Sequence, residues 1–351
     1  MSERVAVIGD GAMGTICAIM LAENGHRVRF WSAFPEAAEA LAAARENRRF
    51  LPGVKLPDSI EVTGRDEEAM AGASLAISAV PTQFMRSVWT RLGKQCPADL
   101  PICSVTKGIE NHTLLCPSGI LQDVLGPAPD RIAVLSGPSI APEIACRQPA
   151  TVAVAGPAGL ARRVQRLISR PYFRVYTNPD MIGVEIAGAT KNVIAIAAGM
   201  LDGLGFGSNA KAALLTRGLA EITRLGRRLH ARAATFAGLA GVGDLVTTCI
   251  SPVGRNRSFG EALGRGSTVA QALGATDSVV EGVATTASVI ALAHREQIEM
   301  PITEAVAAVL GGRLSPTQAV EELMRRPLKA EEGHAQESPA TPDAENGDKC
   351  R

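Results

Sequence analysis

A single lysine, Lys191, stands inside a long stretch of small and apolar residues and is the strongest candidate for a catalytic group. The stretch runs from residue 183 to 218 and reads GVEIAGATKNVIAIAAGMLDGLGFGSNAKAALLTRG. Residues 184–200 suit one helix, in which small side chains recur every three or four positions on one face. Glycine and alanine leave space beside the ammonium that a small substrate could fill. The face consists of Val184, Gly188, Lys191, Ala195 and Ala198.

Two more charged residues could partner a buried lysine. Asp244 lies in the apolar stretch GLAGVGDL, and Lys107 follows a predicted strand. Because a buried charge requires an opposite charge or a chemical role, we expect Asp244 to pair with a lysine. The alternatives are ordinary: Asp244 could cap a helix that starts at Leu245, Lys107 could be solvated, and Lys191 could lie on the surface of an alanine-rich helix.

Two glycine-containing segments could bind an anionic group. In SPVGRN, Arg255 and Asn256 follow Gly254, and a guanidinium binds phosphate through charge-assisted hydrogen bonds. In SGPSIAPE, Gly137 and Ser139 belong to a turn that leads into a helix, whose first amides could bind an anion. Ser139 could equally cap that helix, and Arg255 could be a plain loop arginine.

The N-terminus carries a strand, a glycine-rich turn and a helix in immediate succession. Residues 4–8 form a short strand, GDGAMG follows, and a helical pattern comes next. Gly9 permits the tight turn, Gly11 lets the backbone approach a pyrophosphate, and Gly14 lets helix and strand pack closely. Free amides at the helix N-terminus favour an anion there. This context predicts a dinucleotide-binding site rather than a fortuitous glycine turn.

The end of the second predicted strand bears on which dinucleotide is bound. Residues 27–31 end in Ser32-Ala33 rather than in the Asp or Glu that accepts hydrogen bonds from an adenine ribose. Because no carboxylate stands there to repel a 2′-phosphate, we expect NADP(H) to be preferred over NAD(H), with Ser32 at the cofactor. Nearby basic residues that could bind the phosphate are Arg29, Arg45, Arg48 and Arg49.

Further apolar strands predict a doubly wound, mostly parallel α/β sheet of the Rossmann type. Ligands of such sheets bind beyond the carboxyl ends of the strands. Phe84 in PTQF and Lys107 in TKGIE follow two of these ends and are therefore expected at the cofactor. The additional strands are predicted at residues 75–80, 101–106, 132–135 and 151–155.

The sequence changes character near residue 180, which predicts a domain boundary. Strand patterns give way to alanine-rich helical patterns that continue to about residue 326. We expect residues 1–179 to form a Rossmann-like dinucleotide-binding domain and residues 180–328 to form an all-helical substrate and catalytic domain. Residues 329–351 are predicted to be a disordered polar tail, because from residue 331 they contain no Val, Ile, Leu, Met or aromatic residue.

Composition excludes several classes of function. With 36 basic and 35 acidic residues in 351 and a formal net charge of +1, nucleic acid is not expected as a partner. The seven cysteines include no CxxC pair, so neither a disulfide framework nor a metal site is expected. A strand is predicted almost at once, and no apolar run is expected to approach the roughly 18 residues of a membrane span. The sequence therefore predicts a cytoplasmic protein without a transmembrane segment.

The chain closely resembles bacterial NAD(P)-dependent glycerol-3-phosphate dehydrogenases. The similarity extends from residue 4 to about 330 and rests on several long motifs in unbroken order. It implies a Rossmann domain, an all-helical C-terminal domain and reversible oxidation of sn-glycerol 3-phosphate to dihydroxyacetone phosphate. It further implies a homodimer and a supply of glycerol 3-phosphate for phospholipid synthesis. The motifs include GDGAMG, FLPGVKLP, AVPTQF, SVTKGIE, LSGPSIAPE, VEIAGATKNVIAIAAG, GLAGVGDLVTTC, SPVGRN and VVEGV.

The resemblance also implies roles for individual residues. Lys191 would be the proton acceptor, with Lys107 and Asp244 as its catalytic neighbours. The residues that would line the glycerol phosphate are Lys107, Gly137, Ser139, Lys191, Asp244, Gly254, Arg255 and Asn256. The residues that would contact the dinucleotide are Ala12, Met13, Lys107, Ala141, Arg255, Val279 and Glu281, in addition to the glycine turn.

Two positions depart from the family pattern. Gly254 replaces the usual serine, so only its backbone could help to hold the ligand. Ser32 and Ala33 stand where a basic residue usually follows the tryptophan.

Two other functions remain open from the sequence. One is a dehydrogenase for a hydroxy acid or a hydroxyacyl thioester, although no histidine is a persuasive base. The other is an NADPH-binding regulator without catalytic activity, which would be expected to have lost Lys107, Lys191 or Asp244.

Overall fold

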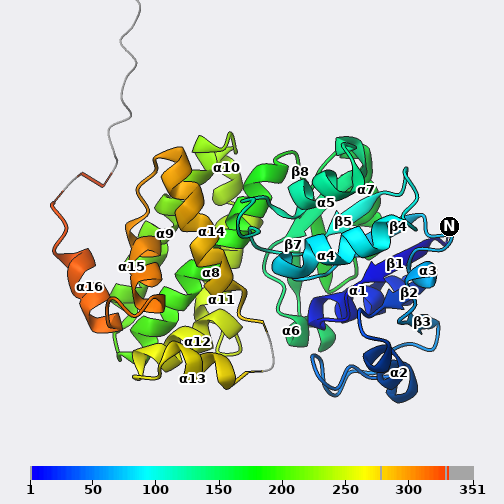
Figure 1. Cartoon of the computed structure of the whole chain (residues 1–351), viewed down its shortest axis with the longest axis horizontal. Helices are drawn as coiled ribbons and strands as arrows, with labels where there is room; N and C mark the ends of the chain where they lie inside the picture. The colour runs from blue at the N-terminus through cyan, green and yellow to red at the C-terminus, as the bar shows by residue number, and fades with distance from the viewer. Residues whose placement is uncertain (1, 277–278, 329, 332–351) are drawn as a thin grey trace, which may run out of the picture.

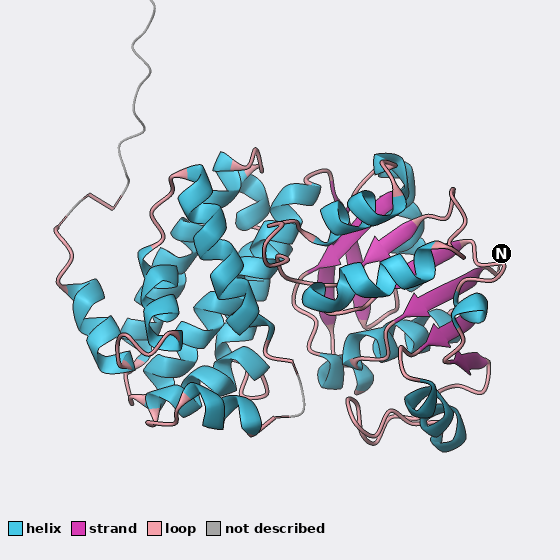
Figure 2. Ribbon diagram, viewed as in Figure 1, coloured by secondary structure: helices cyan, strands magenta, loops and turns pink. Residues whose placement is uncertain are grey.

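The computed structural model describes residues 2–276, 279–328 and 330–331 and consists of an α/β half and a helical half (Figure 1). Figure 2 shows the strands gathered in the half that contains the N-terminus and only helices in the other. The Rossmann-type fold followed by helices is therefore confirmed. Almost all of the predicted polar tail, residues 329–351, lies outside the described residues.

The α/β half is built on one eight-stranded sheet with the order β3-β2-β1-β4-β5-β6-β7-β8. Every neighbouring pair is parallel except β6 and β7, which are antiparallel. The order of the strands reverses at β1: β2 and β3 lie on one side of it, and β4 and the later strands lie on the other. Nucleotides bind at such a switch point in doubly wound sheets. The strands are β1 Arg4–Ile8, β2 Arg27–Trp31, β3 Ile60–Thr63, β4 Leu75–Ser78, β5 Ile102–Ser104, β6 Ile132–Ser136, β7 Ala150–Ala155 and β8 Phe173–Asn178.

Helices cover both faces of the sheet, which explains the continuous apolar sequence of its central strands. In β1, Val5 and Val7 pack on the face covered by α1, α6 and α7, whereas Ala6 and Ile8 pack on the face covered by α4 and α5. The helices of this half are α1 Ala12–Glu23, α2 Pro35–Ala44, α3 Asp66–Ala69, α4 Thr82–Gly93, α5 Pro117–Leu125, α6 Ala141–Ala145 and α7 Ala158–Ile168, with a 3₁₀ turn, η1, at Pro129–Arg131.

The two edge strands, β3 and β8, are not predicted from the sequence. Each has only one neighbouring strand, and β8 alternates buried and exposed positions. Edge strands carry polar residues on their open side, so the run FRVYTN lacks the apolar continuity of the central strands. The sheet therefore continues to Asn178, two residues before the point at which the sequence becomes helical.

The helical half is organised around α8, Met181–Gly203, which is buried on all sides from Gly183 to Leu201. The face of small side chains that includes Lys191 is therefore buried together with the rest of α8. In Figure 1, α8 runs through the middle of the helical half. The surrounding helices are α9 Ser208–Arg228, α10 Ala233–Phe236, η2 Leu239–Gly243, α11 Asp244–Ile250, α12 Arg255–Gly264, α13 Val269–Gly274, α14 Glu281–Glu296, α15 Pro301–Leu310 and α16 Pro316–Met324.

Two described stretches are long and apolar enough to cross a membrane by length and composition alone. They are α8 and the segment Ala233–Ile250, which joins α10, η2 and α11. No apolar run of this length is predicted from the sequence, so the apolar length of both stretches is greater than expected. In α8 the 18-residue window has a mean hydropathy of 1.4 and is 83% buried. Burial of this degree is that of a core helix, whereas the window in Ala233–Ile250 is 39% buried. Two such stretches are weak support for a membrane span.

Glycine lets α8 and α12 pack with their backbones in contact. A Cβ atom on Gly199 would lie 1.9 Å from the carbonyl oxygen of Arg257, and one on Gly260 would lie 2.0 Å from that of Ile196. Any larger residue would push the helices apart. This close approach holds the first turn of α12 beside the middle of α8, where Lys191 lies.

A buried carboxylate, Glu185, joins α8 to the α/β half. It accepts hydrogen bonds from the backbone N–H of Ser118 at 2.8 Å and from the Ser118 hydroxyl at 2.6 Å, at the start of α5. Burial raises the pKa of Glu185 from 4.5 to about 7, against the opposing effect of these hydrogen bonds. The folded protein therefore binds this proton more tightly than the unfolded chain does.

Glu185→Gln is expected to make the protein's stability less sensitive to pH. The raised folded pKa means that the stability contributed by protonated Glu185 is complete below pH 4.5 and is lost as pH rises through about 7. Between pH 5 and 8 the parent should lose on the order of 2–3 kcal/mol relative to the glutamine variant. Urea unfolding of both proteins at several pH values measures the difference, and parallel pH profiles would contradict the prediction.

Candidate active site

Lys191 lies at the centre of the helical half, and its ammonium is held by two residues of α11. Its Nζ is 2.8 Å from Asp244 Oδ1 and donates a hydrogen bond to the hydroxyl of Thr248. Lys191 is only 6% exposed. The sequence predicts a buried lysine paired with Asp244, and the geometry has both features. Thr248, one helical turn after Asp244, is a contact that the sequence analysis does not identify.

Lys107 approaches the same carboxylate from the α/β half. It follows β5, and its Nζ lies 2.6 Å from Asp244 Oδ2 and donates to the carbonyl oxygen of Gly137 at 3.0 Å. Burial lowers the pKa of Lys107 from 10.5 to about 8; the nearby positive charge of Lys191 adds to this effect, and Asp244 opposes it. The ion pair of Lys107 with Asp244 thus connects the sheet to the helical half beside Lys191.

Asp244 bridges the two lysines and is 2% exposed. It is the first residue of α11, but the N-cap is Gly243, and the Asp244 carboxylate contacts the lysines. Burial alone would raise the pKa of Asp244, but the two ammonium groups outweigh it and lower the pKa. The chain reaches this position through a kink at Gly241, where a Cβ atom would lie 2.0 Å from the carbonyl oxygen of Phe236.

The three charged groups together carry an excess of one positive charge when both lysines are protonated. Such a buried cluster stabilises negative charge that develops on a nearby oxygen. Glu281 is half-buried at the start of α14, and burial raises its pKa. The positive charges of Arg255, Lys191 and Lys107 oppose that rise, so Glu281 interacts electrostatically with the same cluster. The arrangement is suited to moving a proton to or from an oxygen atom of a small ligand.

The first turn of α12 forms a second part of the site. Gly254 is the N-cap, Arg255 is exposed, and Asn256 is buried. The Asn256 side chain accepts a hydrogen bond from the backbone N–H of Gly282 at 2.9 Å, which ties α12 to the start of α14. Arg255 donates to the carbonyl oxygen of Val279 at 3.0 Å. Free amides and a guanidinium at one helix end fit a phosphate group.

The turn between β1 and α1 has the shape that a dinucleotide requires. Gly9 has a φ of +107°, and a Cβ atom on Gly14 would lie 2.0 Å from the carbonyl oxygen of Gly9. Gly11 has no atom within 4 Å of its own Cβ position, so its outer side is open to a ligand. The helix begins at Ala12. These residues fit the pyrophosphate of NAD(P).

The other residues that are predicted to contact a ligand lie near the carboxyl ends of the strands and differ in exposure. Phe84 is 54% exposed on the first turn of α4, so its ring is available to a ligand. Ser139 caps no helix, since its hydroxyl donates to the carbonyl oxygen of Gly137 and the N-cap of α6 is Ile140. Ala141 begins α6, and Met13, on α1, is partly buried.

Ser32, whose contact with the cofactor stays a prediction, has no side-chain surface to offer a ligand. Its side chain is fully buried, and its hydroxyl donates to Asp10 Oδ2 at 2.8 Å. It therefore lies beneath the surface that a cofactor would contact. The sequence gives no direct sign of this burial, because β2 is followed by the partly exposed residues Ala33 and Phe34.

Asn192 is a further site residue that the sequence analysis leaves without a role. It follows Lys191 on α8 and is 3% exposed, yet its amide nitrogen has no hydrogen-bond partner among the described residues. A buried amide without a partner is unfavourable, so this donor is available to a bound ligand.

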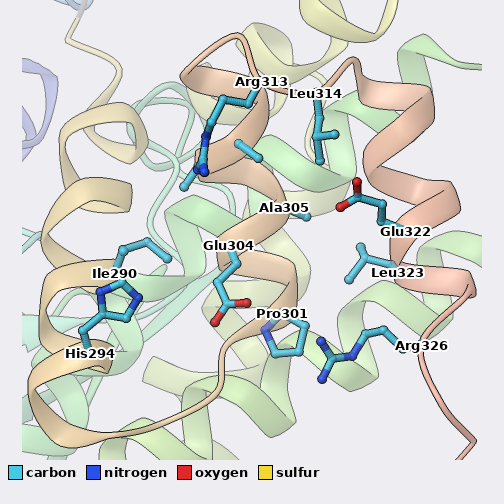
Figure 3. A pocket seen from close by; sticks show the side chains of 12 residues that line it. Ile290, His294, Pro301, Glu304, Ala305, Arg313, Leu314, Glu322, Leu323 and Arg326 are labelled. Atoms are coloured by element: carbon cyan, nitrogen blue, oxygen red, sulfur yellow. The ribbon is translucent and has the colours of Figure 1, made fainter.

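A separate hollow of about 400 Å³ lies among α14, α15 and α16 (Figure 3). Its polar residues include His294, Glu304, Arg313 and Arg326. His294 is thirteen residues after Glu281 on α14, and a rise of about 1.5 Å per residue places it about 20 Å away along the helix. None of the predicted site residues lines this hollow.

The chain matches known proteins over almost all of its length. The model of the NAD-dependent glycerol-3-phosphate dehydrogenase N-terminus matches residues 4–159, and the model of the C-terminus of the same family matches residues 180–321. A protein of Citrifermentans bemidjiense named glycerol-3-phosphate dehydrogenase [NAD(P)+] is 49% identical over 333 residues, which cover 94% of this chain and 99% of the relative.

Another relative and a solved structure agree with these matches. A Mycobacterium tuberculosis protein named glycerol-3-phosphate dehydrogenase [NAD(P)+] 2 is 48% identical over 94% of this chain and 99% of its own length. The crystal structure of glycerol-3-phosphate dehydrogenase from Coxiella burnetii superposes with a TM-score of 0.89 at 38% identity, covering 93% of this chain and 99% of that one.

Proposed function

The chain belongs to the NAD-dependent glycerol-3-phosphate dehydrogenase family, and we propose that Lys191 is the group that exchanges a proton with the substrate. The enzyme interconverts sn-glycerol 3-phosphate and dihydroxyacetone phosphate and uses NAD(H) and NADP(H). The observation that supports the role of Lys191 is its burial beside Asp244, 2.8 Å away. The preference for NADP(H) stays a prediction.

The reaction requires a group that compensates charge on the C2 oxygen. When bound, the nicotinamide supplies the hydride that reduces C2 of dihydroxyacetone phosphate, or accepts it in the reverse direction. As negative charge grows on the C2 oxygen, the Lys191 ammonium donates a hydrogen bond and then a proton to it. In the reverse direction the neutral amine accepts the proton of the C2 hydroxyl. Asp244 and Thr248 orient the nitrogen throughout.

Lys107 and Asp244 prepare the site for this step. Lys107 adds positive charge next to Lys191, which stabilises an anionic ligand and the developing oxyanion. Asp244 holds both ammonium groups, at 2.6 Å and 2.8 Å. We propose that this carboxylate fixes their positions and balances one of the two charges, and that it takes no proton itself.

The start of α12 supports a role in binding the substrate phosphate. Arg255 is exposed there, and Gly254 and Asn256 flank it at the helix N-terminus. Gly254 lacks the hydroxyl that the family pattern has, so in our proposal the backbone amides and the guanidinium supply the contacts. The phosphate is distant from the reacting carbon and is bound in the ground state and the transition state alike.

Arg255→Ala is expected to raise KM for dihydroxyacetone phosphate on the order of tenfold or more while kcat changes little. Steady-state kinetics measures both constants. Arg265→Ala, at the exposed far end of the same helix, is the control. Unphosphorylated dihydroxyacetone should be reduced equally by the parent and by Arg255→Ala. An unchanged KM for the phosphorylated substrate would assign the phosphate to another group.

The activity itself is tested by mixing the purified protein with dihydroxyacetone phosphate and NADPH or NADH and following the absorbance of the reduced cofactor. Loss of absorbance that depends on the substrate is expected. A protein that binds the cofactor without oxidising it would be a regulator rather than an enzyme.

We further propose a homodimeric enzyme of the cytoplasm that supplies glycerol 3-phosphate for phospholipid synthesis. The family resemblance supports each of these points. We also propose residues 1–179 as the dinucleotide-binding domain and residues 180–328 as the catalytic domain. The end of β8 at Asn178 and the start of α8 at Met181 support this division.

A further inference from the structure

Asp10 brings a carboxylate to the end of β2, where the sequence has none. It lies between Gly9 and Gly11 in the turn after β1, and its Oδ2 accepts a hydrogen bond from the Ser32 hydroxyl at 2.8 Å. Ser32 directly follows β2 and is fully buried. The side chain of Asp10 is therefore directed across the switch point of the sheet, towards the strand end that reads the adenine ribose in Rossmann folds.

Buried neighbours fix Asp10 in this position. The side-chain amide of Asn47, which is 6% exposed, donates to the Asp10 carbonyl oxygen at 2.7 Å and to the Thr15 hydroxyl at 2.7 Å. The Ser32 hydroxyl donates to the carboxylate at 2.8 Å and lies farther, at 3.3 Å, from its other acceptor, the carbonyl oxygen of Phe34. Asp10 itself is half-buried, so the Asp10 carboxylate remains accessible from the side of the glycine turn.

From this geometry we infer that Asp10 binds the adenine-ribose hydroxyls of the cofactor and discriminates against a 2′-phosphate. A carboxylate accepts hydrogen bonds from two neighbouring hydroxyls, as the Asp or Glu at the end of β2 does in many NAD-binding proteins. The same charge repels a phosphate on the 2′-oxygen. The inference rests on dinucleotide binding, which the proposed function includes, but it does not rest on the role of Lys191.

Two of the four arginines that could bind a 2′-phosphate make their contacts away from Asp10. Among the described residues no ion pair involves Asp10. Arg29 pairs with Glu61, and Arg45 donates to the carbonyl oxygens of Ile60 and Pro57. These two candidates for binding a 2′-phosphate are thus engaged elsewhere.

A further guanidinium, that of Arg91, contacts the end of β2. Arg91 of α4 donates to the carbonyl oxygen of Ala33 at 3.2 Å and stacks over Trp31, but its charge is paired with Asp66. Asp10 therefore acts against the predicted preference for NADP(H), which was based on the absence of an acid at this strand end.

The inference is tested by binding of two adenosine probes, which needs no catalysis. Dissociation constants of 5′-AMP and of adenosine 2′,5′-bisphosphate are measured by calorimetry for the parent, Asp10→Asn and a control, Glu39→Gln, which removes an exposed carboxylate from α2. Asparagine keeps an acceptor for Ser32 and removes the charge. We expect Asp10→Asn to shift the ratio of the two constants at least tenfold in favour of the bisphosphate, while the control leaves it unchanged.

The same shift is expected in the dissociation constants of NADPH and NADH, measured by fluorescence. If Asp10→Asn does not fold, Asp10→Ala serves in its place and should shift both ratios in the same direction. An unchanged ratio overturns the inference, and so does equal weakening of both probes, which would mark a purely structural role. A parent protein that lacks dehydrogenase activity, together with a shifted ratio in the variant, would instead count against the proposed catalysis alone.

Discussion

Replacing Lys191 by alanine is expected to lower kcat for reduction of dihydroxyacetone phosphate by a factor on the order of 100 or more. The variant loses the only group that we propose to donate a proton to the C2 oxygen, and no water of comparable acidity replaces an ammonium held 2.8 Å from Asp244. Binding of NADPH should change little, because the glycine turn lies in the other half of the molecule. Steady-state kinetics and NADPH fluorescence measure the two quantities.

Two comparisons make this result specific. Lys94→Ala, on the exposed end of α4, should retain parental kcat. Added methylamine should restore part of the activity of Lys191→Ala, because a small ammonium ion can enter the space left by the side chain; it should not affect the parent. Activity of Lys191→Ala within threefold of the parent would remove Lys191 from the mechanism.

Asp244→Asn is expected to damage both stability and catalysis. It leaves two ammonium groups close together without their shared counter-ion, and breaking a buried ion pair in this way destabilises a protein by about 3–5 kcal/mol. The pKa of Lys107 should then fall further below about 8, because Asp244 is the group that opposes the lowering by burial and by Lys191. Urea unfolding and kcat are the measurements.

A double variant separates the effect of charge from that of packing. If the loss arises from uncompensated positive charge, Lys107→Met combined with Asp244→Asn should recover stability relative to Asp244→Asn alone, because one buried ammonium is then removed. Asp244→Asn within 1 kcal/mol of the parent would show that the carboxylate is not the counter-ion of the two lysines. Equal stability of the single and double variants would assign the loss to packing.

Much of the proposed catalytic cluster could be predicted from the sequence, because charged residues are rare within such apolar stretches. A lysine among alanines and an aspartate among leucine, valine and glycine require partners, and the geometry supplies Lys191 and Asp244 to each other. The central helix and the inner strands follow from apolar patterns that burial on both faces enforces. Thr248 could have been found from its spacing, since it lies one helical turn after Asp244.

Other features depend on contacts between distant segments, which a single sequence does not reveal. Asp10 precedes Ser32 by 22 residues, and only the parallel pairing of β1 and β2 brings the glycine turn to the end of β2. The carboxylate that lies at the end of β2 therefore comes from the turn after β1. The edge strands β3 and β8 are short or mixed in polarity, so their apolar signal is weak.

A crystal structure of the enzyme with NADP+ and dihydroxyacetone phosphate tests the central claim most directly. The account predicts that Lys191 Nζ lies within hydrogen-bonding distance, about 3 Å, of the C2 oxygen while keeping its contact with Asp244. A C2 oxygen held by another donor, with Lys191 Nζ beyond about 4 Å, would contradict it.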